Sequence, residues 1–369
     1  MNAPRRQLGL SLIELMVAML IGAVLIAGAA QVYVNSKGAY SNNESIARLQ
    51  ETARYAMSVI EPDVRMSNYW GLLKGAAVIA GQLPQTAAIA APVASGAPAN
   101  ICGRNFATDV STNLQGDNNV YTISATKQTG CDSLQDLSTG VVWNTKPVTT
   151  ADTLTVRRAS VFGSTWGPAG TLQVCTSRIA GRLMSDGLAA SCPAAVVGQP
   201  DAVATAKLQN LIVDTYYIDQ NSQQQANLPS LRRKTVTAVG GVTQFRDQEI
   251  IAGVEDMQVQ FGIDTFGNTG IAQRYVNPNG VPAGAQIVAV RIWLLVRSDT
   301  AENGFTDSRI YQYGDRLQAT GVTGDLNAAA GAGMAYQPSL STNATFTGPQ
   351  HVRRLLISRT IQVRNALGT

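Results

Sequence analysis

The chain has 369 residues, of which 45% are apolar and 14% are charged, and its formal net charge is +4. The ordinary apolar fraction excludes a disordered or collagen-like chain, and so small a net charge is by itself no argument for nucleic-acid binding. His351 is the single histidine, which excludes a histidine-rich metal site and leaves a serine-type catalytic triad only one possible base.

The amino terminus carries the clearest signal. Residues 1–9 are polar and contain two arginines, and an apolar run with Glu14 as its single charge follows over residues 10–30. As a helix this run would be roughly 31 Å long, about one hydrocarbon core. The basic flank predicts that residues 1–9 face the cytoplasm and that the rest is exported. A cleavable secretory signal peptide and a plain membrane anchor are the two simpler interpretations.

Neither of these interpretations explains Glu14, because a carboxylate in an apolar span costs about 2.5–3.5 kcal/mol on insertion scales. A partner arises if the chain is cut between Gly9 and Leu10. Glu14 then lies four positions after a new α-ammonium group and can face that of its own chain or of a neighbouring subunit. The helix macrodipole also favours a carboxylate in the first turns. Such a charged pair would fix the register of identical helices packed side by side.

The motif G-L-S-L-I-E at residues 9–14 resembles the class III signal of type IV prepilins, commonly G-F-T-L-I-E, and differs from it at Leu10 and Ser11. The resemblance implies that a membrane prepilin peptidase cuts between Gly9 and Leu10 and methylates the amine of Leu10. It also implies that Glu14 is the residue that pairs with an amine during assembly.

The helical period continues beyond the apolar run. Apolar residues recur at steps of three or four over residues 46–64, which indicates a helix face packed on a globular head. The pattern predicts one helix from about Leu10 to about Ile60, reaching at most Met66. Pro62 is expected to kink or end it.

Strand patterns fill the remainder of the chain. Short runs broken by turn residues occupy residues 105–206, with candidates at 120–125 and 153–158. Five clearer patterns lie at residues 216–222, 230–236, 250–264, 287–297 and 353–365. The first two predict a hairpin with a long loop. In the third, apolar and polar residues alternate as in a half-buried strand, and the fourth predicts a central strand.

Several of these blocks add a second resemblance. Residues 48–71 are similar to the helix end of PilW-type minor pilins, and the blocks at 253–264, 288–297 and 353–365 resemble the same family. The expected fold class is α+β and pilin-like: a long N-terminal amphipathic and transmembrane helix on an antiparallel sheet head with a large irregular insert. The expected divisions are a leader at 1–9, a transmembrane and filament-core half-helix at 10–34, an amphipathic half-helix at 35–66, a variable β-rich insert with disulfides at 67–206 and a sheet core at 207–369.

The four cysteines are Cys102, Cys131, Cys175 and Cys192, and no two of them form a C-x-x-C motif. Export favours disulfides over free thiols. Of the three possible pairings, Cys102–Cys131 with Cys175–Cys192 is preferred because short loops are the cheapest to close. Four buried thiols are the alternative.

Known catalytic patterns are absent, since the sequence has no G-x-S-x-G, Walker A or H-E-x-x-H motif. Asp264 and Asp315 lie in predicted loops near Asn and Gly, which leaves calcium as an alternative without EF-hand spacing. The arginine pairs 157–158, 232–233 and 353–354 could touch phosphates, but such pairs more often lie on solvated strands or in salt bridges. The sequence therefore predicts no enzyme, no cofactor and no metal site.

The resemblance implies a minor pilin in the tip or priming complex of a type IV pilus, serving adhesion, twitching motility or DNA uptake. Its implied partners are other minor pilins, the major pilin, the prepilin peptidase, the inner-membrane assembly platform and a tip adhesin, with no nucleic acid among them. The protein would span the inner membrane once, with a periplasmic head, and lie on the pilus after assembly. The alternatives are a J-like minor pseudopilin of type II secretion and a membrane-anchored periplasmic binding or adhesion protein.

Overall fold

The computed structural model describes residues 11–81, 107–119, 121, 133–135, 142–144, 146–148, 150–185, 187, 207–239, 241–267, 269–302, 304–316 and 351–366. Nearly all of the strand expected at 120–125 lies outside them. The chain divides into two compact units, Met1–Arg48 and Leu49–Thr369, and we call the second unit the head.

One long helix, α1 (Leu12–Arg65), contributes to both units. Within the head its buried apolar side chains follow the helical period, and they are Leu49, Ala53, Ala56, Met57, Ile60 and Val64. Ile46 was expected to open this stripe but is 42% exposed, so the buried face begins one turn later, at Leu49.

The helix reaches Arg65, near the far limit predicted, and the expectation that Pro62 would end it is wrong. Pro62 lies in the last turn, where a missing N–H group costs a single backbone hydrogen bond. The turn after it remains intact, because the Met66 amide donates to the Pro62 carbonyl at 3.0 Å. The chain then leaves the helix at Asn68, whose φ of 60° is left-handed.

The larger sheet has eight described strands. They are β1 (Ile79–Ala80), β2 (Leu114–Gln115), β5 (Leu154–Ala159), β6 (Gln173–Thr176), β7 (Gly181–Met184), β8 (Lys207–Asp219), β9 (Ser230–Val239) and β10 (Val242–Ala252). Their order is β1-β7-β6-β8-β5-β2, and β9 joins β8 to β10. The pairing of Asp219 with Ser230 confirms the predicted hairpin, and β5 confirms the strand predicted at 153–158.

The second sheet is antiparallel and contains four strands in the order β12-β11-β13-β14. They are β11 (Val254–Asp264), β12 (Arg274–Val276), β13 (Gln286–Arg297) and β14 (Arg354–Gln362), with the short helix η2 (Pro278–Gly280) between β12 and β13. The central position predicted for residues 287–297 is confirmed. A separate pair is formed by β3 (Ser133–Gln135) and β4 (Val142–Asn144).

Strand β11 differs from the half-buried strand that its alternation predicts, because it is buried on both faces. Gln258 and Gly262, on the face expected to be solvated, are also buried. Gln258 is covered by Asn119, whose side chain it contacts, and by the turn at Gly314. Segments distant in sequence thus cover a face that looks polar from sequence alone.

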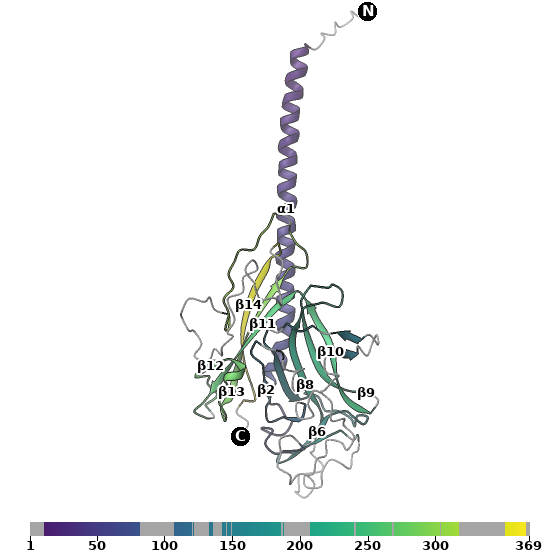
Figure 1. Ribbon diagram of the computed structural model, residues 1–369, viewed down its shortest axis with the longest axis vertical. Helices are drawn as coiled ribbons and strands as arrows, with labels where there is room; N and C mark the ends of the chain where they lie inside the picture. Colours follow the sequence, from purple (N-terminus) through teal and green to yellow (C-terminus); the bar gives the residue numbers. More distant parts are fainter. Residues whose placement is uncertain are drawn as a thin grey trace, which may run out of the picture. The chain divides into compact units, whose positions relative to one another are not determined.

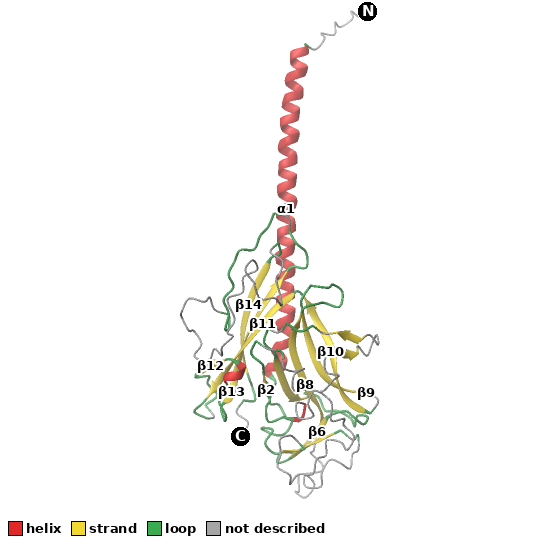
Figure 2. Ribbon diagram, viewed as in Figure 1, coloured by secondary structure: helices red, strands yellow, loops and turns green. Residues whose placement is uncertain are grey.

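Within the head, α1 runs beside the strands of both sheets (Figures 1 and 2), and one apolar cluster joins the helix to both. The cluster contains the buried face of α1, Leu154, Val156 and Tyr216 of the larger sheet, and Val259, Ile292 and Ile361 of the second sheet, among others. Because both sheets share this cluster with one helix, α1 is the element that unites the head.

The chain crosses from the larger sheet to the second sheet at Gly253, the single residue between β10 and β11. Its φ is +88°, its amide donates to Pro229 at 2.6 Å, and its carbonyl accepts from Arg297 at 2.8 Å. A Cβ atom placed there would lie 2.9 Å from the Arg297 carbonyl oxygen. Both the backbone angle and the lack of space require glycine at this corner.

We expect Gly253→Ala to destabilise the head more than Gly241→Ala, a matched change in the turn before β10. Both glycines have positive φ, but no atom lies within 4 Å of a Cβ at Gly241. The two variants therefore share the left-handed penalty of about 1–2 kcal/mol, and the contact with Arg297 adds about 1–3 kcal/mol at Gly253. Denaturant unfolding of the full chain in detergent measures the difference. Equal losses would show that the corner has room for a side chain.

Candidate functional site

The N-terminal half of α1 presents apolar side chains that have no cover. Every described residue from Ser11 to Tyr40 is exposed apart from Gly22, which is partly exposed. The large apolar residues include Leu12, Leu20 and Ile26, each at least two-thirds exposed. Among the described helices, α1 alone is long and apolar enough to cross a membrane. This half of the helix is suited to lipid or to the apolar faces of other helices.

A capping box closes the start of this helix. The Ser11 amide donates to Glu14 Oε2 at 2.9 Å, and the Glu14 amide donates to Ser11 Oγ at 3.3 Å. Two of the four amides that a helix start leaves unpaired are thereby satisfied. The carboxylate is held at the positive end of the helix dipole, which favours its charge. Within the described residues, Glu14 Oε1 accepts no hydrogen bond, so one oxygen can receive another donor.

Sequence reasoning missed the role of Ser11, although S-L-I-E before an apolar run is itself the signature of a capping box. Gly9 and Leu10, the predicted cleavage residues, lie outside the described residues. Glu14 is nevertheless bonded to the amide of Ser11, the residue directly after Leu10. The capping box therefore keeps the carboxylate at the end of the chain where cleavage would create the amine.

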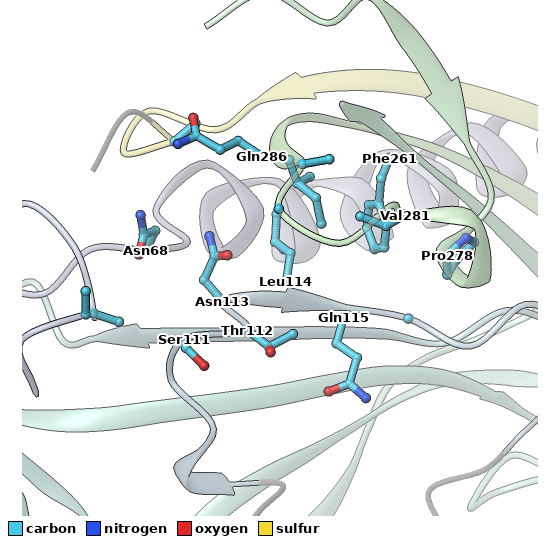
Figure 3. A pocket seen from close by; sticks show the side chains of 17 residues that line it. Asn68, Ser111, Thr112, Asn113, Leu114, Gln115, Phe261, Pro278, Val281 and Gln286 are labelled. Atoms are coloured by element: carbon cyan, nitrogen blue, oxygen red, sulfur yellow. The ribbon is translucent and has the colours of Figure 1, made fainter. Parts of the chain in front are cut away.

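The head contains an open cleft of about 500 Å³ (Figure 3). Its lining includes Asn68 after α1, Leu114 and Gln115 of β2, Phe261 of β11 and Val281 after η2. None of its lining residues is ionisable. The cleft offers polar and apolar contacts to a ligand, but no acid, base or metal-binding carboxylate.

The three arginine pairs singled out in the sequence are engaged inside the head. Carboxylates pair with five of the six guanidinium groups: Arg158–Asp63, Arg232–Asp247, Arg233–Asp214, Arg353–Glu302 and Arg354–Glu255. The sixth, Arg157, donates to the Thr112 carbonyl and to Gln115. These groups are consequently committed to internal contacts and not to phosphates.

The two acidic loops noted in the sequence differ in environment. Thr269 donates to Asp264 through its hydroxyl at 2.7 Å, and this bond, together with loop amides, lowers the pKa of Asp264 to about 2. Burial instead raises the pKa of Asp315. No group of three or more His, Cys, Asp or Glu residues in the described part of the chain is arranged to hold a metal ion.

Cys175 in β6 is buried and disulfide-bonded. Cys102, Cys131 and Cys192 lie outside the described residues, so the pairing of Cys175 with Cys192 and of Cys102 with Cys131 stays a prediction.

Comparison with known families identifies two matching segments. Residues 4–30 match the prokaryotic N-terminal methylation motif, and residues 215–365 match the type IV pilus-assembly protein W family. No curated protein and no solved structure gave a significant match.

A single long apolar N-terminal helix, a sheet-rich head and a methylation motif at the helix start define a pilin. The two matches support a PilW-type pilin of a type IV pilus system. Proteins of this class take part in pilus assembly with other pilins and membrane components, and pilin domains are structural rather than catalytic.

A buried ionic cluster fixes the C-terminal part of α1 to the larger sheet. Asp63 on the helix accepts hydrogen bonds from Tyr216 and from Arg158, the latter at 2.6 Å. Asp214 is buried beside them, with Arg233 at 3.4 Å and one carboxylate oxygen unpartnered. Burial and, secondly, the neighbouring Asp63 carboxylate raise the pKa of Asp214 to about 6, although Arg233 acts in the opposite direction.

We expect Asp214 to make the stability of the head depend on pH. Its folded pKa of about 6 lies above the ordinary 3.8, so its contribution is fully present below about pH 4 and is lost as the pH rises through 6. The free energy of unfolding of the wild type, relative to Asp214→Asn, should therefore fall by up to about 3 kcal/mol between pH 4 and 7. Denaturant unfolding of the full chain in detergent measures both proteins. A constant difference across this range would contradict the buried-acid assignment.

Proposed function

We propose that the protein is a minor pilin of the priming complex at the tip of a type IV pilus, where it helps to start assembly. The observation that carries this proposal is the exposed apolar half of α1 with the capped Glu14 at its start. The complex would serve adhesion, twitching motility or DNA uptake. Its members would be other minor pilins, the major pilin and a tip adhesin.

Before assembly the precursor would span the inner membrane once, with residues 1–9 in the cytoplasm and the head in the periplasm. The prepilin peptidase would hydrolyse the Gly9–Leu10 peptide bond with one water molecule, leaving a carboxylate on Gly9 and an α-ammonium group on Leu10. It would then methylate that amine. The apolar helix holds the mature protein in lipid until the assembly platform extracts it.

In the filament, the helix would exchange lipid for the matching helices of other pilins. Exchange between two apolar environments gives little net hydrophobic energy, so specific packing and polar pairs decide the register. Glu14 supplies such a pair: its Oε2 accepts the Ser11 amide, and its Oε1 faces no donor among the described residues. The α-ammonium of a neighbouring subunit would complete the site.

The size of the head supports a place at the tip. The head runs from Leu49 to Thr369 and contains two sheets and a long insert. Packing so large a head at every helical repeat of a filament would cause steric overlap, whereas the tip has no subunit above it. The size of the head therefore supports a low copy number.

We expect Gly9→Leu to leave the precursor uncut, because a bulky side chain replaces the small residue at the cleaved bond. The matched control is Gly38→Leu, a position on α1 with no neighbouring atom within 4 Å of an added Cβ. Mass spectrometry of the amino-terminal peptide should find methylated Leu10 in the wild type and in the control. A wild-type chain that starts at Met1 would favour an uncleaved anchor, and one that starts at Gln31 a signal peptide.

We expect Glu14→Val and Glu14→Gln to be cut normally but to enter pili at least about tenfold less than the wild type, equivalent to about 1.4 kcal/mol per assembly contact. Glutamine preserves the hydrogen bond of the capping box and removes the charge, so the pair of variants separates the two roles. Immunoblots of sheared pili measure incorporation, and immunogold labelling of the wild type should mark filament ends.

Ser11→Ala is the complementary variant, since it removes the hydroxyl cap and keeps the carboxylate. It should assemble far better than either Glu14 variant. Wild-type incorporation of Glu14→Gln would show that capping, rather than charge pairing, is the function of Glu14. Loss of protein secretion with normal piliation in a deletion strain would indicate a type II secretion pseudopilin.

A further inference from the structure

A second polar cluster lies in the head, around the carboxylate of Asp315. Asn118 and Asn277 donate their side-chain amides to Asp315 Oδ2 at 3.1 and 3.3 Å, and Asn119 donates to the same oxygen. Gln258 donates to Asn119 Oδ1 at 3.2 Å. Segments far apart in sequence therefore place four amide side chains around one acid.

Three oxygen atoms of this cluster are buried and have no hydrogen-bond donor. They are Asp315 Oδ1, Asn118 Oδ1 and Gln258 Oε1. Asp315 is 3% exposed and Gln258 is 1% exposed, so solvent does not compensate them. A Cβ atom on Gly314 would lie 3.5 Å from Gln258 Oε1, which shows that this oxygen faces the backbone beside Asp315. A buried oxygen without a donor is costly unless a ligand satisfies it.

A second buried acid, Asp152, is bonded to the backbone of the cluster, and burial raises the pKa of both Asp152 and Asp315. Asp152 is buried and accepts the amides of Asn119 at 2.8 Å and Val259 at 2.7 Å. Arg316 pairs with Asp256 at 2.9 Å, and its charge also acts on Asp152 and Asp315. Within the described residues, neither Asp152 nor Asp315 forms an ion pair. Burial disfavours the ionised form of both acids, and a cation bound beside them would favour that form.

We propose that this cluster is a calcium site in which Asp315 Oδ1, Asn118 Oδ1 and Gln258 Oε1 are ligands. The amides of Asn119 and Asn277 remain donors to Asp315, because their oxygens accept hydrogen bonds from Gln258 and Gln260. An all-oxygen set of carboxylate and amide groups suits a hard cation. Calcium accepts six to eight such ligands in irregular geometry, whereas magnesium requires a near-ideal octahedron.

Such a site would hold the two sheets together. Asn118 follows β2 of the larger sheet, Gln258 lies on β11 of the second sheet, and Asp315 lies in the turn that covers β11. A cation bound by all three residues would satisfy the oxygens that lack a donor. Its contacts would connect residues next to one sheet with residues of the other. This inference does not depend on the pilin function. It takes up, at Asp315, the calcium alternative that the sequence left open beside its prediction of no metal site.

Calcium titration of the EDTA-treated full chain in detergent tests the proposal. Calorimetry should show one saturable site with a dissociation constant of about 10⁻⁴–10⁻³ M, the range of extracellular calcium modules. A concentration about 100-fold above that constant should raise Tm by roughly 5 °C over EDTA. Asp315→Asn should abolish both effects. Asp264→Asn, a matched change at a carboxylate satisfied by its own loop, should keep them.

Asn118→Asp keeps the proposal falsifiable if Asp315→Asn does not fold. It adds a carboxylate where Asn118 Oδ1 has no donor, so it should lower Tm in EDTA and tighten calcium binding about tenfold. Calcium binding unchanged in Asn118→Asp would place the ion elsewhere and overturn the assignment. No saturable heat, with equal Tm in calcium and EDTA, would show that the cluster holds only water. Equal protection by sodium chloride of the same ionic strength would reduce the effect to screening.

Discussion

The structure depends on one constraint: the first half of α1 exposes its apolar side chains and cannot bury them within the described chain. Burying each large apolar side chain is worth about 1.5–3 kcal/mol, so more than a dozen such residues from Leu12 to Val34 make a water-exposed helix strongly unfavourable. Lipid and the helices of other pilins are the two environments that remove this cost. In the proposed function the protein would move from lipid into the filament. The same apolar helix would suit both environments.

The same helix meets a different constraint in the head. There its apolar face is narrow and packs into the cluster shared by both sheets, while Asp63 is bound by Tyr216 and Arg158. A buried carboxylate contributes little net stability, because its desolvation offsets its pairing, but removing one partner strands the other. Such a group therefore specifies where the helix lies on the sheet more than how tightly it is held. Hydrophobic burial supplies the stability.

Much of this could be predicted from local sequence. The period of three and four marks the buried face of α1 from Leu49 to Val64, and alternation marks β11 and β13 as strands. The capping box of Ser11 and Glu14 could also have been predicted, because its signature needs only four consecutive residues. What local pattern does not reveal is which segments cover a strand. Gln258 looks like a solvated residue until Asn119 and the turn at Gly314 close over it.

The polar cluster at Asp315 shows the same limit at a candidate site. Its members come from four places in the chain, and no spacing rule connects Asn118 with Gln258, Asn277 and Asp315. Sequence could only note an acid in a loop with Asn and Gly nearby, which described Asp264 equally well. The two acids differ in the hydrogen-bond donors that the fold places around them. Asp264 is satisfied by its own loop, whereas Asp315 retains an oxygen without a donor.

The apolar part of α1 and the head would consequently have different roles in recognising other pilins. In the proposed filament, the apolar helix and Glu14 would offer the same chemistry to any pilin with a free amine, so they would set the register without selecting a partner. Selectivity for a partner would then have to come from the head, where side-chain identity varies over the surface. A head that discriminates among partners needs sheets that keep a fixed relation. Two features provide this: the single-residue crossing at Gly253, and the cluster at Asp315, whose ligands come from both sheets. A cation bound in that cluster would make the surface of the head more rigid. It would not contact the N-terminal half of α1, which would pack in the filament.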